Sequence, residues 1–164
     1  TISTIKLNDV EFGDSTFVGC GAEGTIYTST VNGSSWTSRT SGATANTLYG
    51  VTYGNNQFLA VGGTHYTQSG TVIYSVDNGT SWNTTKSNSS GGLYSVAFGN
   101  DKFVGVGYNT VIVSIDNGTY FTQTATNYDF NDIAYGNGLF VAVGDDENIH
   151  TSTDGYTWTK VHGK

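Results

Sequence analysis

The chain has 164 residues, of which 36% are hydrophobic, 12% are charged and 23 are glycine. Its net charge of −7, with six lysines and arginines, argues against a nucleic-acid partner, because phosphate binding requires clustered cations. No apolar run approaches the roughly 18 residues needed to span a bilayer, so we expect one domain that does not insert into a membrane.

A strand-like segment recurs four times and sets the period of the chain. Its central residue is Val10, Val51, Val96 or Ile133, and every copy continues with an aromatic residue and a glycine. The period of roughly 40 residues is typical of propellers and other repeat architectures. A β-prone segment at 1–6 precedes four tandem repeats, at about 7–47, 48–92, 93–129 and 130–164.

Each repeat is predicted to contain four short strands. In the third repeat, apolar runs separated by turn residues place them at 93–98, 102–107, 111–115 and 120–124. Connections this short force neighbouring strands to be antiparallel and leave no room for a crossover helix. We therefore expect an all-β, β-propeller-type fold with four blades of four antiparallel strands. A β-solenoid, with shorter coils and parallel strands, is the second interpretation.

The third turn of the repeats carries a shared motif. Its fullest form is Ser75, Asp77, Gly79 and Trp82. The other copies are Ser114, Asp116 and Gly118 with Phe121 in place of Trp, a form one residue shorter with Ser152, Asp154 and Trp158, and a first copy with Ser29, Gly33 and Trp36 but Val31 where Asp is expected. The Asp side chain can accept hydrogen bonds from backbone N–H groups in such a turn, Gly permits a positive φ, and Trp covers the hairpin. These residues are therefore predicted to be structural, not metal ligands.

This pattern, Ser-x-Asp-x-Gly-x-x-Trp, resembles the Asp-box, also called the BNR repeat. Because forms of it occur in all four repeats, the resemblance to sialidase-like and photosystem-assembly-factor-like propellers covers the whole chain. It implies a fold far more strongly than an activity. Sialidases hold their carboxylated sugar with several arginines, whereas this chain has only Arg39, so sialidase activity is not expected.

The closure of the ring has more than one solution, because four blades are at the low end of the range for propellers. We favour closure within the chain, in which residues 1–6 add a strand to the last blade. Alternatively this segment links two chains by strand addition, or two chains join head to tail as half-rings of an eight-bladed propeller.

Aromatic residues outside the repeated pattern are the candidates for ligand binding. The residues that recur in register, Phe12, Tyr53, Phe98, Tyr135 and the Trp36 series, are assigned to the core. His65, Tyr66 and Gln68 lie in the main insertion, at 64–70, and the other tyrosines that do not recur fall in or beside turns: Tyr108, Tyr120, Tyr128 and Tyr156. Of these, Tyr108 and Tyr128 join the insertion residues as the predicted ligand-binding set. Tyrosine with neighbouring amides and carboxylates suits stacking on a sugar and hydrogen bonding to it. The alternative is that these are ordinary surface tyrosines.

Acidic residues offer a weaker case for catalysis or metal binding. Asp9 and Glu11 lie on one face of a strand, and Asp132 would join them near the channel of a closed ring. Paired carboxylates can hydrolyse glycosides, but solvated channel acids are the simpler interpretation. The loop 145–147, Asp-Asp-Glu, could take a weak Ca²⁺, although such spacing is common on surfaces.

No cofactor is expected. His65, His150 and His162 are scattered and form no zinc-type cluster. No glycine-rich run precedes a helix, which excludes a nucleotide cradle. Cys20, the only cysteine, stands where the other repeats have Val, so a buried, inert thiol is expected.

Together these features predict a secreted, extracellular, non-catalytic module that binds a glycan or another extracellular ligand. The low charge and the absence of Met fit a chain that has lost a leader. Asn-x-Ser/Thr sequons occur at Asn32, Asn78, Asn83, Asn88 and Asn117. One alternative is a structural protein that assembles into homo-oligomers or filaments through its terminal strands. The other is a glycan-cleaving enzyme.

Overall fold

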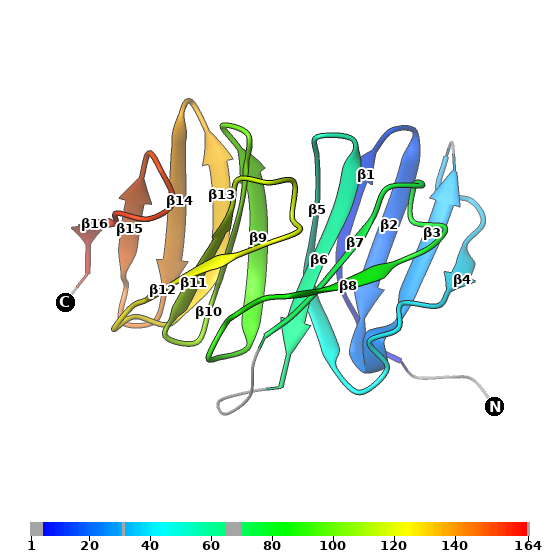
Figure 1. Cartoon of the computed structure of the whole chain (residues 1–164), viewed down its shortest axis with the longest axis horizontal. Coiled ribbons are helices and arrows are strands. Elements are labelled where there is room, and N and C mark those ends of the chain that lie inside the picture. Colours follow the sequence, from blue (N-terminus) through cyan, green and yellow to red (C-terminus); the bar gives the residue numbers. More distant parts are fainter. Residues whose placement is uncertain (1–4, 31, 65–69, 164) are drawn as a thin grey trace.

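The computed structural model describes residues 5–30, 32–64 and 70–163, and they form four antiparallel sheets (Figure 1). Each sheet contains four strands in sequence order, and each corresponds to one repeat. The predicted all-β fold with four blades of four strands is therefore confirmed. The only helical element in the described residues is a single 3-10 turn, Ala22–Gly24, so none of them forms a helix able to cross a membrane.

In each blade the four strands follow one another in chain order from the inside of the molecule to the outside. The first blade consists of β1 (Leu7–Gly13), β2 (Thr16–Gly21), β3 (Ile26–Thr30) and β4 (Thr37–Arg39). The second consists of β5 (Thr47–Gly54), β6 (Gln57–Gly63), β7 (Thr71–Ser75) and β8 (Asn83–Lys86). The third consists of β9 (Leu93–Gly99), β10 (Lys102–Gly107), β11 (Thr110–Ser114) and β12 (Thr122–Ala125). The fourth consists of β13 (Phe130–Gly136), β14 (Leu139–Gly144), β15 (Ile149–Ser152) and β16 (Thr159–His162).

The predicted strand ends in the third repeat are correct to within one or two residues. The third strand begins at Thr110, which pairs with Gly107 and with Ala125, and not at Val111. It ends at Ser114, because Ile115 already belongs to the following turn and is exposed.

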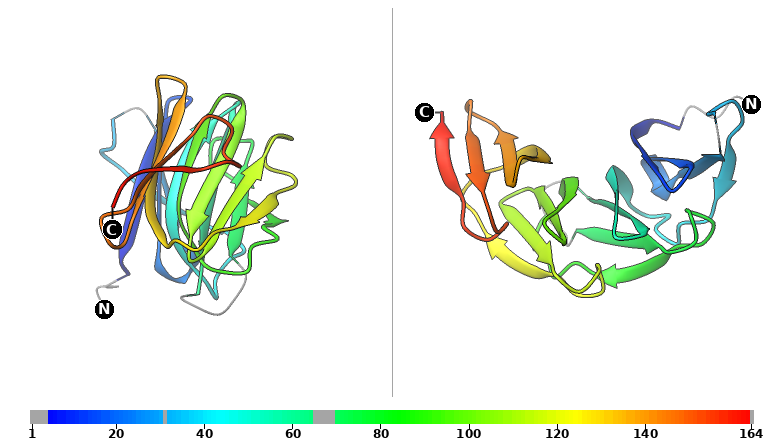
Figure 2. Two further views of the ribbon diagram at one scale, coloured as in Figure 1. Left: turned by 90° about the vertical axis from the view of Figure 1, so that its left-hand side faces the viewer. Right: turned by 90° about the horizontal axis from the view of Figure 1, so that it is seen from above.

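The four blades form an open arc. The inner strands β1, β5, β9 and β13 lie side by side in that order, and the two chain ends lie at opposite ends of the arc (Figure 2). Closure by residues 1–6 on the last blade, the favoured prediction, is therefore wrong for the described part of that segment. Lys6 lies instead beside the first blade, where its carbonyl accepts the Ala22 N–H (2.9 Å), and residues 1–4 lie outside the described residues.

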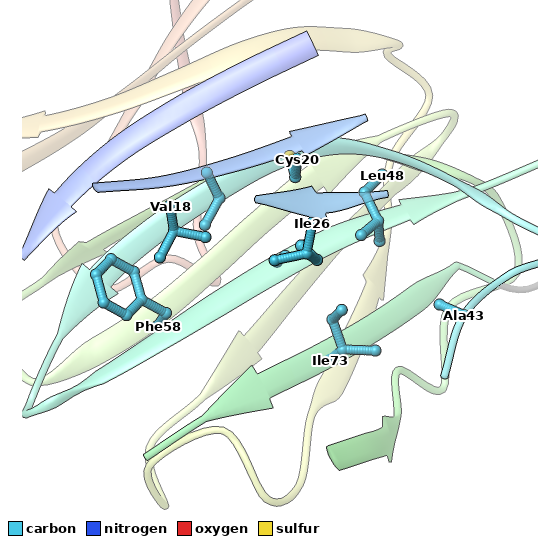
Figure 3. Packing of buried hydrophobic residues seen from close by; sticks show 9 residues of the cluster. Val18, Cys20, Ile26, Ala43, Leu48, Phe58 and Ile73 are labelled. Atoms are coloured by element: carbon cyan, nitrogen blue, oxygen red, sulfur yellow. The ribbon is translucent and has the colours of Figure 1, made fainter. Parts of the chain in front are cut away.

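Apolar side chains of adjacent blades form the core. Val18, Cys20 and Ile26 of the first blade pack with Leu48, Phe58 and Ile73 of the second (Figure 3). Cys20 is fully buried as predicted, and burial raises the pKa of its thiol. Comparable clusters join the second blade to the third and the third to the fourth. Burial of apolar area between blades is therefore the main force that holds the arc together.

A repeated contact sets how closely the blades approach. The glycine that ends each of the first three inner strands lies under an aromatic ring of the next blade, so a Cβ at Gly13, Gly54 or Gly99 would overlap the ring of Tyr53, Phe98 or Tyr135. Phe12 and Trp36 have no preceding blade, and the prediction that they belong to the core is wrong for this reason. Phe12 is 51% exposed, and Trp36 is also exposed.

Candidate ligand-binding site

One edge of the arc carries two of the predicted tyrosines, Tyr108 and Tyr128, together with Tyr49 and Tyr94. It is the edge where the inner strands begin and where the second strand of each blade turns into the third. Tyr49 and Tyr94 stand at the same position of β5 and β9, and their rings meet edge to face with centroids 5.8 Å apart. The first and fourth blades have Asn8 and Asn131 at this position. We call this the tyrosine edge, defined by Tyr49, Tyr94, Tyr108 and Tyr128.

The structure brings two predicted residues, Tyr108 and Tyr128, to this edge. Tyr108 lies in the turn between β10 and β11, where its N–H donates to the carbonyl of Gly92 (3.0 Å). Tyr128 lies in the link between the third and fourth blades. The two segments are tied together because the Asn109 N–H donates to Asp129 Oδ1 (2.9 Å). Backbone hydrogen bonds therefore position both turns.

The Tyr128 ring is held from within the fourth blade. It contacts the imidazole of His150, with centroids 4.3 Å apart, and Lys160 Nζ lies 5.9 Å from its centroid. More than a third of Tyr128 is nevertheless exposed. A ring that is supported on one side and open to solvent elsewhere can contact a ligand at little entropic cost.

The other predicted residues, His65, Tyr66 and Gln68, lie outside the described residues. Thr64, which precedes them, borders the tyrosine edge. A Cβ at Gly92 would lie 2.9 Å from the Thr64 carbonyl oxygen and 3.8 Å from the Tyr94 ring. The start of the insertion thus borders the Tyr49–Tyr94 pair.

A polar hollow of about 410 Å³ lies on the second blade, beside the loop that links it to the first. Its wall includes the start of β7, the end of β8 and the loop after β4, and it is lined by hydroxyls and amides from Thr71, Thr84, Thr85, Ser87, Asn46 and Asn88. Lys86 is the only charged residue in this lining. Thr71 pairs with Lys86 at the end of the blade where the tyrosines lie, so the hollow opens near the tyrosine edge. Its size suits a small polar ligand.

The three candidate acids stabilise the inner strands or lie beside them. Asp9 accepts hydrogen bonds from the N–H groups of Val10 and Val51 (both 2.8 Å), and the bond from Val51 ties the first blade to the second. Asp132 accepts the Ser95 hydroxyl (2.7 Å), which ties the fourth blade to the third. Burial raises the pKa of Asp9, with a smaller contribution from the charge of Asp132, and burial also raises the pKa of Glu11. Asp9 and Asp132 therefore each join two adjacent blades through a hydrogen bond.

The Ser-Asp-Gly turns lie at the opposite edge. Asp77 Oδ1 accepts the Ser75 hydroxyl (2.8 Å) and the Ser81 N–H (2.9 Å), and Trp82 Nε1 donates to the Gly79 carbonyl (3.0 Å). The turns at Ser114, Asp116 and Gly118 and at Ser152, Asp154 and Trp158 repeat this pattern. Hydrogen bonds from Ser81 lower the pKa of Asp77. In the described residues, no three His, Cys, Asp or Glu side chains form a possible metal site.

Solved structures with the same architecture are β-propellers. YCF48 bound to D1 peptide is 18% identical with a TM-score of 0.75, and it matches 99% of this chain and 55% of its own. YCF48 from Cyanidioschyzon merolae is 14% identical with a TM-score of 0.76, at 100% and 58% coverage. The Pan2 WD40 domain of Neurospora crassa is 12% identical with a TM-score of 0.77, at 98% and 50% coverage. The fold is that of a β-propeller.

These propellers share the fold with this chain at low sequence identity. The chain spans between half and three-fifths of the length of each, 50%, 55% and 58%. No family model and no curated protein sequence matches it. The likeness therefore establishes the blade architecture, while the chemistry of the site has to come from the residues present.

Sequence reasoning missed Tyr49 and Tyr94. Both lie inside the recurring segment, which was assigned to the scaffold as a whole. The available signal was the variation at this one position, which reads Asn, Tyr, Tyr and Asn along the four repeats. A position whose residue changes from repeat to repeat is one that the shared fold does not restrict to a single residue type.

Proposed function

We propose that this chain is a non-catalytic binding module for a neutral carbohydrate. The observation that carries the proposal is that four tyrosines lie along one edge of the arc and that a hollow lined by hydroxyls and amides opens near the same edge. Tyrosine rings stack on the apolar faces of sugars, and hydroxyls and amides bond to their hydroxyl groups. Neither feature alone is specific, but a sugar uses both.

The charge distribution favours a neutral ligand over an acidic one. The chain carries −7, and Asp9, Glu11 and Asp132 lie on the inner strands that begin at this edge. Lys86 alone among the residues lining the hollow is cationic. A sialylated or sulfated glycan would meet repulsion without an arginine cluster to offset it.

Binding without catalysis is supported by the use of the carboxylates. Asp9 and Asp132 accept hydrogen bonds that join adjacent blades, so the fold itself accounts for these two carboxylates. An extracellular location belongs to the same proposal, supported by the low charge density and the sequons. Several of the sequon residues, such as Asn78 and Asn117, lie in exposed turns.

A peptide ligand is the second candidate. One structurally similar propeller is described as bound to D1 peptide. An extended peptide would lie along the tyrosine edge and use the same rings. A cationic or neutral sequence would suit the negative charge of the arc.

The proposal is tested by screening neutral glycans, acidic glycans and peptides and then titrating the best ligand. We expect a neutral glycan to bind and Tyr94→Ala to weaken its binding about fivefold, since an aromatic contact contributes about 1 kcal/mol. Tyr120→Ala is the matched control, because Tyr120 is 61% exposed but lies at the opposite edge, beside the Asp116 turn. Binding of peptides alone would favour the second candidate, and equal losses in both variants would refute the site.

A further inference from the structure

The two ends of the arc expose matching halves of the interface that joins its blades. The front half of that interface comes from the following blade and includes the residues equivalent to Leu48, Val51 and Tyr53. The back half comes from the preceding blade and includes the terminal glycine of the inner strand and the residues equivalent to Val18 and Cys20. Each half is covered three times inside the chain and left open once.

The open front half lies on the first blade. We call it the head face, defined by Leu7, Val10, Phe12 and Trp36. Val10 is 57% exposed, whereas its equivalent Val51 is 3% exposed. A hollow of about 710 Å³ lies on this face, bordered by Leu7, Val10, Tyr27 and Trp36 among others.

The open back half lies on the fourth blade. We call it the tail face, defined by Gly136, Val141 and Val143. Val141 and Val143 are 36% and 41% exposed, whereas Val18 and Cys20 are fully buried. A Cβ at Gly136 would meet nothing within 4 Å, in contrast to Gly13, Gly54 and Gly99, which all lie under rings.

The turns repeat the same asymmetry. Gly79 packs against Val18 and Thr28 of the preceding blade, and Gly155 packs against Val104 and Val113. A Cβ added at Gly33, in the first blade, would meet nothing within 4 Å. Its partner by repeat equivalence is the surface around Val141, which is on the tail face.

We infer that two copies of this chain join head to tail and close an eight-bladed ring. In this ring the Phe12 ring of each copy covers the partner subunit's Gly136, as Tyr53 covers Gly13 within the chain. The occupant is a second copy because each exposed face already has its complement in this same sequence. The interface continues one that the fold uses three times.

The geometry of the arc favours closure at two copies. The chain matches about half the length of three propeller chains, and its four blades form an open arc (Figure 2). A head-to-tail interface gives a closed ring when its rotation sums to a full turn and an open filament when it does not. Two half-rings meet that condition, and closure leaves neither apolar face exposed.

The test is the mass of the full chain by light scattering across a concentration series. The inference predicts the mass of two chains. Gly136→Ala is the decisive variant, because its Cβ has open space in one copy but overlaps the Phe12 ring of the partner in a ring. We expect this variant, and Phe12→Ala, to weaken association at least about tenfold.

The control is Ile115→Ser, an exposed turn residue outside both faces, which should keep the wild-type mass. Circular dichroism and thermal melting of each variant report whether the single chain is folded. A wild-type monomer throughout the series would overturn the inference. So would a filament, or a dimer whose affinity is unchanged by both Gly136→Ala and Phe12→Ala.

Discussion

His150 shows how one residue departs from the repeat it belongs to. It pairs across the sheet with Ala142, as Ile73 pairs with Ala60 and Ile112 with Gly105. The side chain is buried against Tyr128 and Phe130, and neither ring nitrogen has a hydrogen-bond partner. Burial lowers the pKa of His150, and the charge of Lys160 lowers it further. A histidine here occupies a site that the second and third blades give to isoleucine and the first blade gives to Tyr27.

Replacing His150 with Ile is expected to stabilise the fold by about 1–2 kcal/mol, because the buried, unpaired nitrogens are removed. The folded histidine has a lower pKa than the unfolded one, so the unfolded chain binds more protons below about pH 6.5. The wild type should therefore lose stability as the pH falls below that value, and His150→Ile should lose less. Urea unfolding at pH 7.5 and 5.5 measures both effects. An identical loss in the two proteins would contradict the assignment.

Asp77 provides a second test at the scale of one side chain. Asp77→Ala removes the acceptor for Ser75 and for Ser81, and we expect a loss of about 1 kcal/mol, since the residue is exposed. Thr80→Ala, in the same turn, is the control and should change the unfolding free energy by less than half of that. Chemical denaturation compares them. Equal effects would mean that the carboxylate does not hold the turn.

At the scale of the element, the sequence pattern predicted the strands well and their surroundings less well. Four strands per repeat, their antiparallel order and their approximate ends follow from alternation and from short turns. Whether a residue is buried also depends on the next blade, which self-comparison of the repeats does not supply. Phe12 and Trp36 match core residues of the other blades and yet are exposed, because the neighbour that would cover them is missing.

Substitutions at the glycines that end the inner strands test how far packing depends on the next blade. Gly54→Ala places a methyl group against the ring of Phe98, so we expect a loss of about 1–3 kcal/mol or more. Gly136→Ala makes the same change at the open end, where the single chain has room, and should leave the monomer's unfolding free energy within about 0.5 kcal/mol. Thermal or urea unfolding at low protein concentration distinguishes them. Similar losses at both positions would show that backbone freedom, and not blade packing, is the reason for glycine.

The candidate site was predictable only in part. Tyr108 and Tyr128 stood out because they interrupt the repeat, and the structure places both at one edge. Tyr49 and Tyr94 lie inside the repeated segment, and the hollow is lined by the second blade and the loop that leads into it, so neither feature is visible in a linear pattern. A site formed by residues from separate parts of the chain can be recognised only once the structure places them in space.

At the scale of the whole molecule, the order of the blades follows from the sequence but the closure does not. The segment at 1–6 looked suited to the last blade, yet its described part lies beside the first, at the other end of the arc. Closure depends on the curvature contributed by each blade interface, which is a sum over many contacts. The arc therefore leaves two apolar faces whose natural cover is another set of the same blades.

Small-angle X-ray scattering of the wild type and of Gly136→Ala, at the same concentration, tests this account most directly. We predict that the wild-type curve fits a closed ring of two chains with a central opening, and that the variant curve fits one open arc. A wild-type curve that fits the single arc at every concentration would contradict the account, as would a variant that still forms the ring.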